Sequence, residues 1–211
     1  MNKLRRTICQ VRACSAKPGT KKYPRFCPSA WGSPALAEAE EIYTIDPEIK
    51  KLALAAARTE AIGYMQDTRL EDTIAFAQRI GAKHLGIANC VGLMREAIIL
   101  EEILTKRGFK VSAVCCKVGS IDKEKIGLRD EEKVRPGRYE ALCNPIGQAK
   151  LLNEAQTDLN IAVGLCVGHD SLFFKYSQAP ITVLVAKDRV LAHNPAAALY
   201  LSDSYYRRLR E

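Results

Sequence analysis

The sequence predicts an α/β fold: a three-layer, mostly parallel sheet with an antiparallel hairpin at one edge and a cysteine-bearing arm at the N-terminus. Residues 83–89 and 109–116 are apolar runs of strand length that flank a helical stretch, 93–107. Strand, helix and strand at this spacing indicate parallel strands joined by a right-handed crossover. A second alternation of helix and strand follows, and 211 residues with 47% hydrophobic content suffice for one well-filled core.

Two segments of different composition set the domain boundaries. Residues 1–33 are rich in Lys, Arg, Pro and Gly and have no apolar period, so this N-terminal arm could not bury enough surface to fold alone. Residues 34–211 are expected to form the α/β domain.

Helices are expected wherever an N-cap residue precedes an apolar face of helical period, as at Ser33-Pro34 and Asp46-Pro47. The expected helices cover residues 34–43, 47–64, 69–80, 93–107, 145–156 and 170–177, with a last one that starts at Asn194-Pro195 and ends in Arg207, Arg208 and Arg210.

Strands are expected where short apolar runs lie between turn signals. They cover residues 83–89, 109–116, 160–165, 181–186 and 190–193, and the last two are expected to form the antiparallel hairpin through Lys187-Asp188-Arg189. The charged stretch 117–139 has no sustained period, so it is either a functional loop or disordered.

Charge and cysteine usage limit the class of protein. Eight basic residues precede the first acidic one, Glu38, and beyond them the basic and acidic residues balance at 24 each. Nucleic-acid binding would therefore rest on the arm alone, and we do not expect it. No apolar run is long enough to span a bilayer, and eight cysteines without a secretory signal indicate reduced thiols in the cytoplasm.

The arm carries three cysteines, Cys9, Cys14 and Cys27, in a segment with no other reason to be ordered. Three thiolates on one metal ion would supply the missing stabilisation, so we expect a metal site here. The alternative is a frayed basic arm in which the cysteines are incidental.

More cysteines lie where predicted strands end or helices begin: Cys90, Cys116, Cys143 and Cys166. Parallel strands bring such junctions to one edge of the sheet, where ligands usually bind. A helix N-terminus favours the thiolate, which suits either soft-metal ligation or nucleophilic chemistry. Cys90, Cys116, Cys143 and the capping Asn144 are therefore expected to bind a cofactor. The alternative is that these thiols are small core residues at tight turns.

Cys166 and His169 lie on the turn Gly164–Asp170, and they are the expected catalytic residues. His169 could act as an acid or base near the Cys166 thiol or ligate a metal, and it could equally cap the helix that it begins. The chain has no G-x-G-x-x-G, Walker or G-x-S-x-G pattern to indicate nucleotide binding or serine catalysis.

Several motifs resemble one family, the predicted metal-binding proteins of domain of unknown function 1847. They are Ile87–Leu93 (IANCVGL), the run from Cys143 (CNPIGQA), the run from Gly164 (GLCVGHD), Ser177–Pro180 and the run from Lys187 (KDRVLAHNP). The resemblance implies a cysteine-rich metal site but no reaction. Cys9, Cys14 and Cys27 fit the family's N-terminal cysteine pattern, whereas its first cysteine falls on Arg6.

The leading hypothesis is a metal or iron–sulfur site, with zinc or iron, in a thiol-lined cleft used for redox or thiol chemistry on a small molecule. The alternatives are a non-catalytic metal-binding or sensing protein and, last, a nucleic-acid-binding module that uses the arm. The expected partners are a small molecule or a metal ion, with no membrane.

Overall fold

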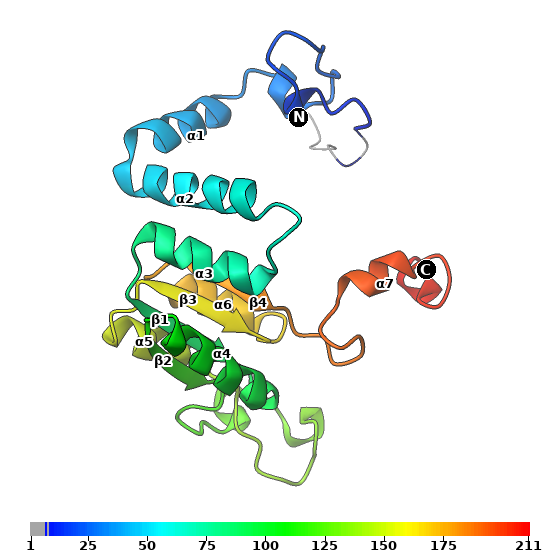
Figure 1. Cartoon of the computed structure of the whole chain (residues 1–211). Helices are drawn as coiled ribbons and strands as arrows, with labels where there is room; N and C mark the ends of the chain where they lie inside the picture. Colours follow the sequence, from blue (N-terminus) through cyan, green and yellow to red (C-terminus); the bar gives the residue numbers. More distant parts are fainter. Residues whose placement is uncertain (1–6, 8) are drawn as a thin grey trace. The chain divides into compact units, whose positions relative to one another are not determined.

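The computed structural model describes residue 7 and residues 9–211, and it divides the chain into two compact units, residues 1–58 and 59–211. The first unit begins with two short 3-10 turns, Ala13–Ser15 and Pro28–Ala30. The helix α1 (Pro34–Ile45) and the greater part of α2 (Pro47–Gly63) complete it (Figure 1).

The start of α2 follows the predicted capping chemistry. The Asp46 carboxylate accepts hydrogen bonds from the backbone N–H groups of Glu48 and Ile49, at 2.9 and 3.1 Å. These are two of the N–H groups that a helix N-terminus leaves without a partner inside the helix.

The second unit is built on four strands that all run in the same direction, in the order β2-β1-β3-β4. The strands are β1 (His84–Asn89), β2 (Lys110–Cys115), β3 (Leu159–Val163) and β4 (Ile181–Val185). Every residue of the central strands β1 and β3 is buried, while the edge strands are partly exposed. The predicted parallel crossover is confirmed, because β1 and β2 pair in parallel on either side of α4 (Met94–Lys106) in the sequence.

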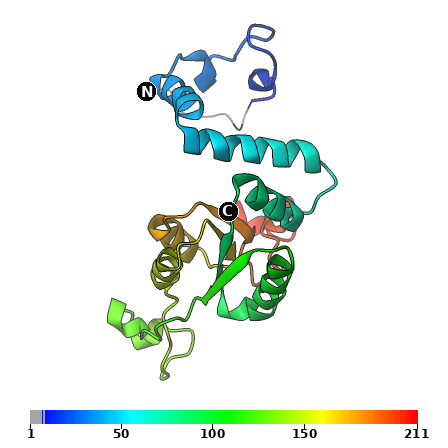
Figure 2. The same cartoon turned by 60° about the vertical axis from the view of Figure 1, so that its left-hand side comes forward.

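Helices cover both faces of this sheet (Figure 2). The chain moves one way from β1 to β2 and the other way from β2 to β3 and β4, so right-handed crossovers put α4 on one face and α5 and α6 on the other. On the second face, α5 (Pro145–Glu154) and α6 (His169–Tyr176) close over an apolar core formed by Ala88, Ala149, Leu152, Ala162, Leu165 and Phe173.

The helix α3 (Arg69–Ile80) packs near the edge strand β4. Thr68 and Glu71 form a reciprocal capping box at its start, and Gly81 ends it in the left-handed conformation. The Arg69 side chain donates to the Val183 carbonyl at 2.6 Å and so ties the first turn of α3 to β4.

The predicted antiparallel hairpin is wrong, because β4 pairs in parallel with β3 and residues 190–193 form turns. The Asp188 carboxylate accepts from the backbone N–H groups of Val190 and Leu191, both at 2.8 Å. Ala192 and His193 have positive φ, 48° and 65°. Left-handed residues and a side chain that engages the backbone donors are incompatible with a strand.

The predicted last helix is also wrong in its length. The helix α7 covers only Ala196–Tyr200, and the chain continues in turns to a 3-10 turn at Arg207–Leu209. The hydroxyls of Ser202 and Ser204 donate to the carbonyls of Leu199 and Leu201, at 2.8 and 3.3 Å. Such local bonds compete with helix continuation.

The long connection between β2 and α5 is irregular but held together by polar contacts. Its two 3-10 turns, Lys123–Ile126 and Asp130–Glu132, are joined by the buried Lys133 side chain. The Lys133 ammonium donates to Glu124 at 2.5 Å and to Asp130 at 2.9 Å. These two carboxylates raise the pKa of Lys133 above its ordinary value.

None of the helices in the described part of the chain combines the length and the apolar character that crossing a bilayer requires.

The Lys133 contacts predict that Lys133→Met destabilises the connection between β2 and α5. The change leaves the Glu124 and Asp130 carboxylates without their shared cation, so the free energy of unfolding should fall. Urea unfolding measures this loss, and limited proteolysis should cut faster within residues 117–142. Lys125→Met, at an exposed position of the same connection, is the control and should change stability by less than about 0.5 kcal/mol. Equal behaviour of the two variants would contradict the prediction.

Candidate functional site

The strands β1 and β3 are neighbours in the sheet, but the chain leaves β1 toward β2 and leaves β3 toward β4, in opposite directions. α/β sheets bind ligands in the crevice at the carboxyl ends of two such strands. Cys90 follows β1 directly, and Cys116 follows β2 directly. Cys166 lies three residues after β3, and Cys143 lies two residues before α5. The parallel direction of the strands therefore brings four cysteines to one edge.

Backbone hydrogen bonds fix the positions of these cysteines. The Cys90 N–H donates to the Val163 carbonyl at 3.0 Å, which extends the pairing of β1 with β3 by one residue. The Cys116 N–H donates to Asn89 at 2.8 Å and its carbonyl accepts from Asn144 at 2.7 Å. Three separate segments are thereby locked together where their thiols meet.

The structure places five of the predicted site residues around one enclosed space, which Leu165 closes. We call them the sheet-edge cluster: Cys90, Cys116, Cys143, Cys166 and His169. Cys90 and Cys116 are buried, whereas Cys143, Cys166 and His169 are half-buried. The space between these side chains has no room for a water molecule.

Cys143 has the electrostatic environment of a thiolate. Its sulfur shares a hydrogen bond with the Cys116 thiol, and the Lys117 ammonium lies beside it. The hydrogen bond from Cys116, aided by the charge of Lys117, lowers the pKa of Cys143 to about 5. The same hydrogen bond and burial raise the pKa of Cys116. The pair therefore consists of a Cys143 thiolate and a Cys116 thiol that donates to it.

Two further contacts to sulfur complete the surroundings. The Arg189 guanidinium donates to the Cys166 sulfur at 3.0 Å, and the Val91 N–H donates to the Cys116 sulfur at 3.3 Å. The thiol at Cys166 raises the pKa of Arg189. Thiolate charge at the cluster is thus compensated from more than one side.

His169 begins α6, and its N–H donates to the Cys166 carbonyl at 2.9 Å. Its ring nitrogen Nδ1 is buried and finds no hydrogen-bond partner in the described part of the chain. A buried polar nitrogen without a partner is costly, so its position at the cluster requires an explanation beyond packing.

Asn144 has a structural task in this fold. Its side-chain oxygen caps α5 by accepting from the Gly147 N–H at 2.8 Å, and its amide nitrogen donates to the Val118 carbonyl at 3.1 Å. Both ends of the side chain are therefore engaged, and what Asn144 contributes is the position of the adjacent Cys143.

The cysteines of the arm do not form a ligand group. Cys27 is buried, Cys9 is half-buried and Cys14 is exposed. Over residue 7 and residues 9–211, no three Cys, His, Asp or Glu side chains have an arrangement that could hold a metal ion as they stand. A metal site at Cys9, Cys14 and Cys27 therefore stays a prediction.

Sequence reasoning missed the cations near the cluster. Lys117 directly follows Cys116, and Arg189 follows the end of β4. Lys187 and Arg189 were assigned to the turn of a hairpin, although residues just beyond a parallel strand lie at the ligand-binding edge. Because residues 190–193 form turns and not a strand, both cations belong to a loop that follows a parallel strand.

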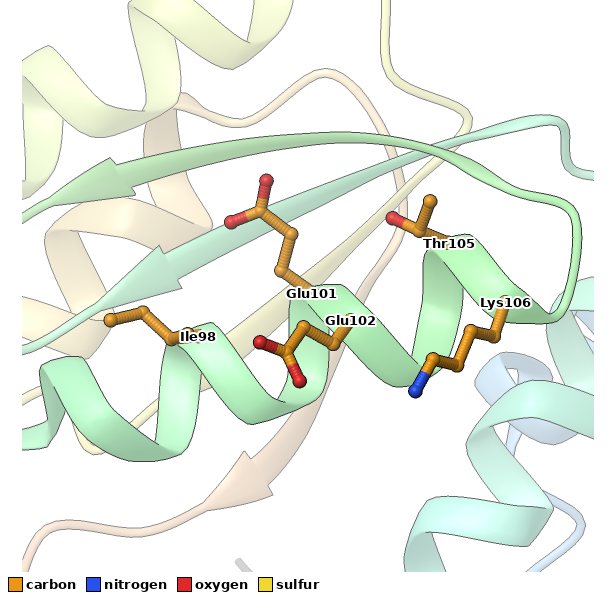
Figure 3. Close-up of a pocket in the computed structure, with 5 residues that line it drawn as sticks. All are labelled: Ile98, Glu101, Glu102, Thr105 and Lys106. Atoms are coloured by element: carbon orange, nitrogen blue, oxygen red, sulfur yellow. The ribbon is translucent and has the colours of Figure 1, made fainter.

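A second hollow lies elsewhere, on the outer face of α4 (Figure 3). It measures about 440 Å³ and is lined by Ile98, Glu101, Glu102, Thr105 and Lys106. These positions recur at helical spacing on one helix, and no other element contributes a side chain. The sheet-edge cluster, to which separate connections of the sheet contribute, is therefore the candidate functional site.

Comparisons with known proteins cover most of the chain. The model of a family described as "Protein of unknown function (DUF1847)" matches residues 27–184, which include the whole sheet-edge cluster. An uncharacterized protein of Methanocaldococcus jannaschii is 52% identical over 161 residues, which cover 76% of this chain and 81% of that protein. No solved structure matches the chain significantly.

The low pKa of Cys143 predicts how its alkylation depends on pH. Labelling by iodoacetamide requires the thiolate, so in the folded, chelator-treated protein the rate should stay high until the pH falls to about 5. In the urea-unfolded chain the same cysteine should lose reactivity below about pH 8.5, which is the ordinary pKa of a cysteine thiol. Because the folded pKa is the lower one, the contribution of Cys143 to stability is full above pH 8.5 and declines between these two values.

Peptide mass spectrometry of a pH series measures both rates. Lys117→Met should raise the pH at which the alkylation rate of Cys143 in the folded protein is half its maximum, because it removes a cation that favours the thiolate. If the half-maximal pH for alkylation of Cys143 is the same in the folded and the unfolded protein, Cys143 is an ordinary thiol.

Gly164 predicts a steric constraint on the same edge. It has a φ of +66°, and a Cβ there would collide with the Leu93 side chain. Gly164→Ala should lower the free energy of unfolding by about 3 kcal/mol, from backbone strain and from the collision. Gly127→Ala is the matched control, since Gly127 has a φ of +87° and open space around it, and it should cost only about 1 kcal/mol. Urea unfolding of both variants tests this, and equal losses would mean that the collision is relieved at no cost.

Proposed function

Since the chain belongs to the family described as protein of unknown function (DUF1847), which names no activity, we propose a function from the site itself. The sheet-edge cluster binds a soft metal ion through cysteine thiolates. The observation that carries this proposal is the convergence of four thiols and one imidazole, supplied by separate connections of the sheet, on one enclosed space.

The donor set favours this assignment. Thiolate sulfur and imidazole nitrogen are the ligands that zinc and iron take from proteins, and zinc is usually held by four of them. The groups that would hold the ion are the sulfurs of Cys90, Cys116, Cys143 and Cys166. The buried, unpartnered Nδ1 of His169 is a fifth donor, and ligation would explain its lack of a hydrogen bond.

Binding requires adjustment of side chains, because no three donors in the described part of the chain stand ready around one point. Each cysteine sulfur moves by rotation about a single bond, so a change of rotamer suffices to redirect it. The backbone bonds that fix Cys90 and Cys116 would keep these two ligands in place while Cys143 and Cys166 adjust.

A bound zinc ion would supply structural rigidity or a Lewis acid, and iron, alone or in an iron–sulfur cluster, would supply electron transfer. Besides the ligands, the chain contributes positive charge close to the cluster. Lys117 and Arg189 would compensate the negative charge that several thiolates bring to one ion.

The hydrogen-bonded pair of Cys116 and Cys143 supports a second candidate function, thiol–disulfide exchange with a small-molecule disulfide. The Cys143 thiolate would attack one sulfur of the substrate, so that a mixed disulfide forms and one substrate thiolate leaves. Cys116 would then lose its proton and attack the Cys143 sulfur. A Cys116–Cys143 disulfide forms, the second substrate thiolate leaves, and the two protein thiols have supplied two electrons.

Metal analysis of protein purified without oxygen tests the first proposal. We expect about one metal ion per chain, with zinc giving a colourless protein and iron giving visible absorbance from thiolate charge transfer. Cys90→Ser and Cys143→Ser should each lose the metal. Cys115→Ser is the matched control, because Cys115 is the direct neighbour of Cys116 but does not line the enclosed space, and it should keep the metal.

Metal-free wild-type protein, or a Cys115→Ser variant that loses metal as the others do, would overturn the proposal.

The second candidate function, thiol–disulfide exchange, has its own test. Equilibration with oxidised and reduced glutathione should give a peptide pair linked through Cys116 and Cys143. Absence of that linkage under oxidising conditions would rule out the exchange.

A further inference from the structure

Three cations lie at the sheet-edge cluster, Lys117 beside Cys143, Lys187 near Cys90 and Arg189 on Cys166. Lys117, Lys187 and Arg189 form no ion pair with any Asp or Glu among the residues that the structure describes. Lys133, in the connection between β2 and α5, is by contrast paired with Glu124 and Asp130. Unpaired positive charge gathered at one site indicates a site for negative charge.

Arg189 has donors to spare. It uses one N–H on the Cys166 sulfur, at 3.0 Å, and the rest of the side chain is exposed. A guanidinium carries five N–H donors in a planar fork that matches the oxygens of a carboxylate or phosphate. One face of Arg189 can therefore contact the thiol while another contacts a ligand.

Lys187 lies near Cys90 at the same edge of the sheet. A Cβ placed on Gly92 would lie 3.4 Å from the Lys187 ammonium and 3.9 Å from the Cys90 sulfur, so the cation and the thiol flank the same glycine. A Cβ placed on Gly164 would lie 3.7 Å from Cδ of Lys187, so the stem of the side chain passes over the end of β3. The absence of side chains at both glycines makes this passage possible.

The loop that carries both cations is rigidly built. We call residues 186–195 the basic loop. The backbone N–H of Asp188 donates to the His193 ring nitrogen Nδ1 at 3.1 Å, and the His193 N–H donates back to the Asp188 carbonyl at 3.0 Å. With the two bonds to the Asp188 carboxylate, the loop has little freedom to fold Lys187 and Arg189 away.

Lys117 completes the arrangement from the other connection. Its ammonium donates to the Ala141 carbonyl at 2.5 Å and lies beside the Cys143 thiol. The carbonyl holds the half-buried side chain in place without neutralising its charge.

We infer that Lys117, Lys187 and Arg189 form a binding site for a small oxyanion, a carboxylate or phosphate group, and hold the molecule that bears it against the thiols of the sheet-edge cluster. This inference rests on the proposed function in that it takes the cluster as the centre that the ligand approaches. Electrostatic attraction of this kind raises the local concentration of anions by roughly tenfold or more and weakens with added salt.

A pair of alkylating reagents of equal chemistry and different charge tests the inference. Iodoacetate is an anion and iodoacetamide is neutral, and both need the same thiolate, so the ratio of their rates cancels the protonation of the thiol. In folded, chelator-treated protein, peptide mass spectrometry should give a ratio at Cys143 and Cys166 about tenfold above that in the urea-unfolded chain. Inorganic phosphate and, in a separate series, acetate should slow iodoacetate more than iodoacetamide, and the stronger competitor identifies the preferred oxyanion.

Charge-removing variants assign the effect to residues. Arg189→Gln and Lys187→Gln should each lower the ratio by about threefold to fivefold. Lys125→Gln removes the same charge at an exposed position of the connection between β2 and α5 and should leave the ratio unchanged. The competition series uses the unaltered protein, so it stands even where a variant fails to fold.

The outcomes separate this inference from the metal proposal. A raised ratio in protein that binds no metal supports the oxyanion site and overturns the metal proposal. If the protein binds metal, but its ratio of iodoacetate to iodoacetamide rates equals that of the unfolded chain and neither phosphate nor acetate changes it, the oxyanion site alone is overturned. Equal losses of the ratio in Lys125→Gln and Arg189→Gln would show a general effect of net charge and would also overturn it.

Discussion

The common direction of the four strands is the constraint from which the rest of this unit follows. Because β1, β2, β3 and β4 are parallel, every connection that leaves a strand starts at the same edge. Right-handed crossovers then send the chain from β1 to one face and from β3 to the other, which opens the crevice between them. Four thiols that are far apart in the sequence meet there because the sheet allows no other place for them.

The hydrogen bonds at this edge convert proximity into defined geometry. The strand pairing continues into Cys90 and Cys116 through their backbone N–H groups, so the backbone that carries these two thiols is held by the sheet. Behind them, the buried Gln148 amide donates to the carbonyls of Asn89 and Val114, at 3.1 and 2.6 Å. The ends of β1 and β2 are thus held together from the face of α5.

Much of this arrangement could be predicted from the sequence, because it depends on local signals. The caps at Asp46, Thr68 and Asn144 and the stop at Gly81 are short-range chemistry, and the strand-end positions of the cysteines follow from apolar runs. The predicted hairpin is wrong because residues 190–193, although largely apolar, form turns and not a second strand. The turn is decided by Asp188 and His193, whose side chains bond to the backbone of their own loop.

The remaining features depend on long-range contacts that no local pattern carries. The contact between Arg189 and Cys166 joins residues 23 positions apart. The different environments of Cys116 and Cys143 arise only once their sulfurs touch.

The unequal burial of the thiols has a kinetic consequence. Cys90 and Cys116 are inner groups, and Cys143 and Cys166 are outer groups that solvent reaches. Anything that arrives at the cluster must engage the outer pair before the inner one, and anything that leaves must release the inner pair first. A metal ion bound here as we propose would therefore exchange stepwise, through an intermediate held by two sulfurs.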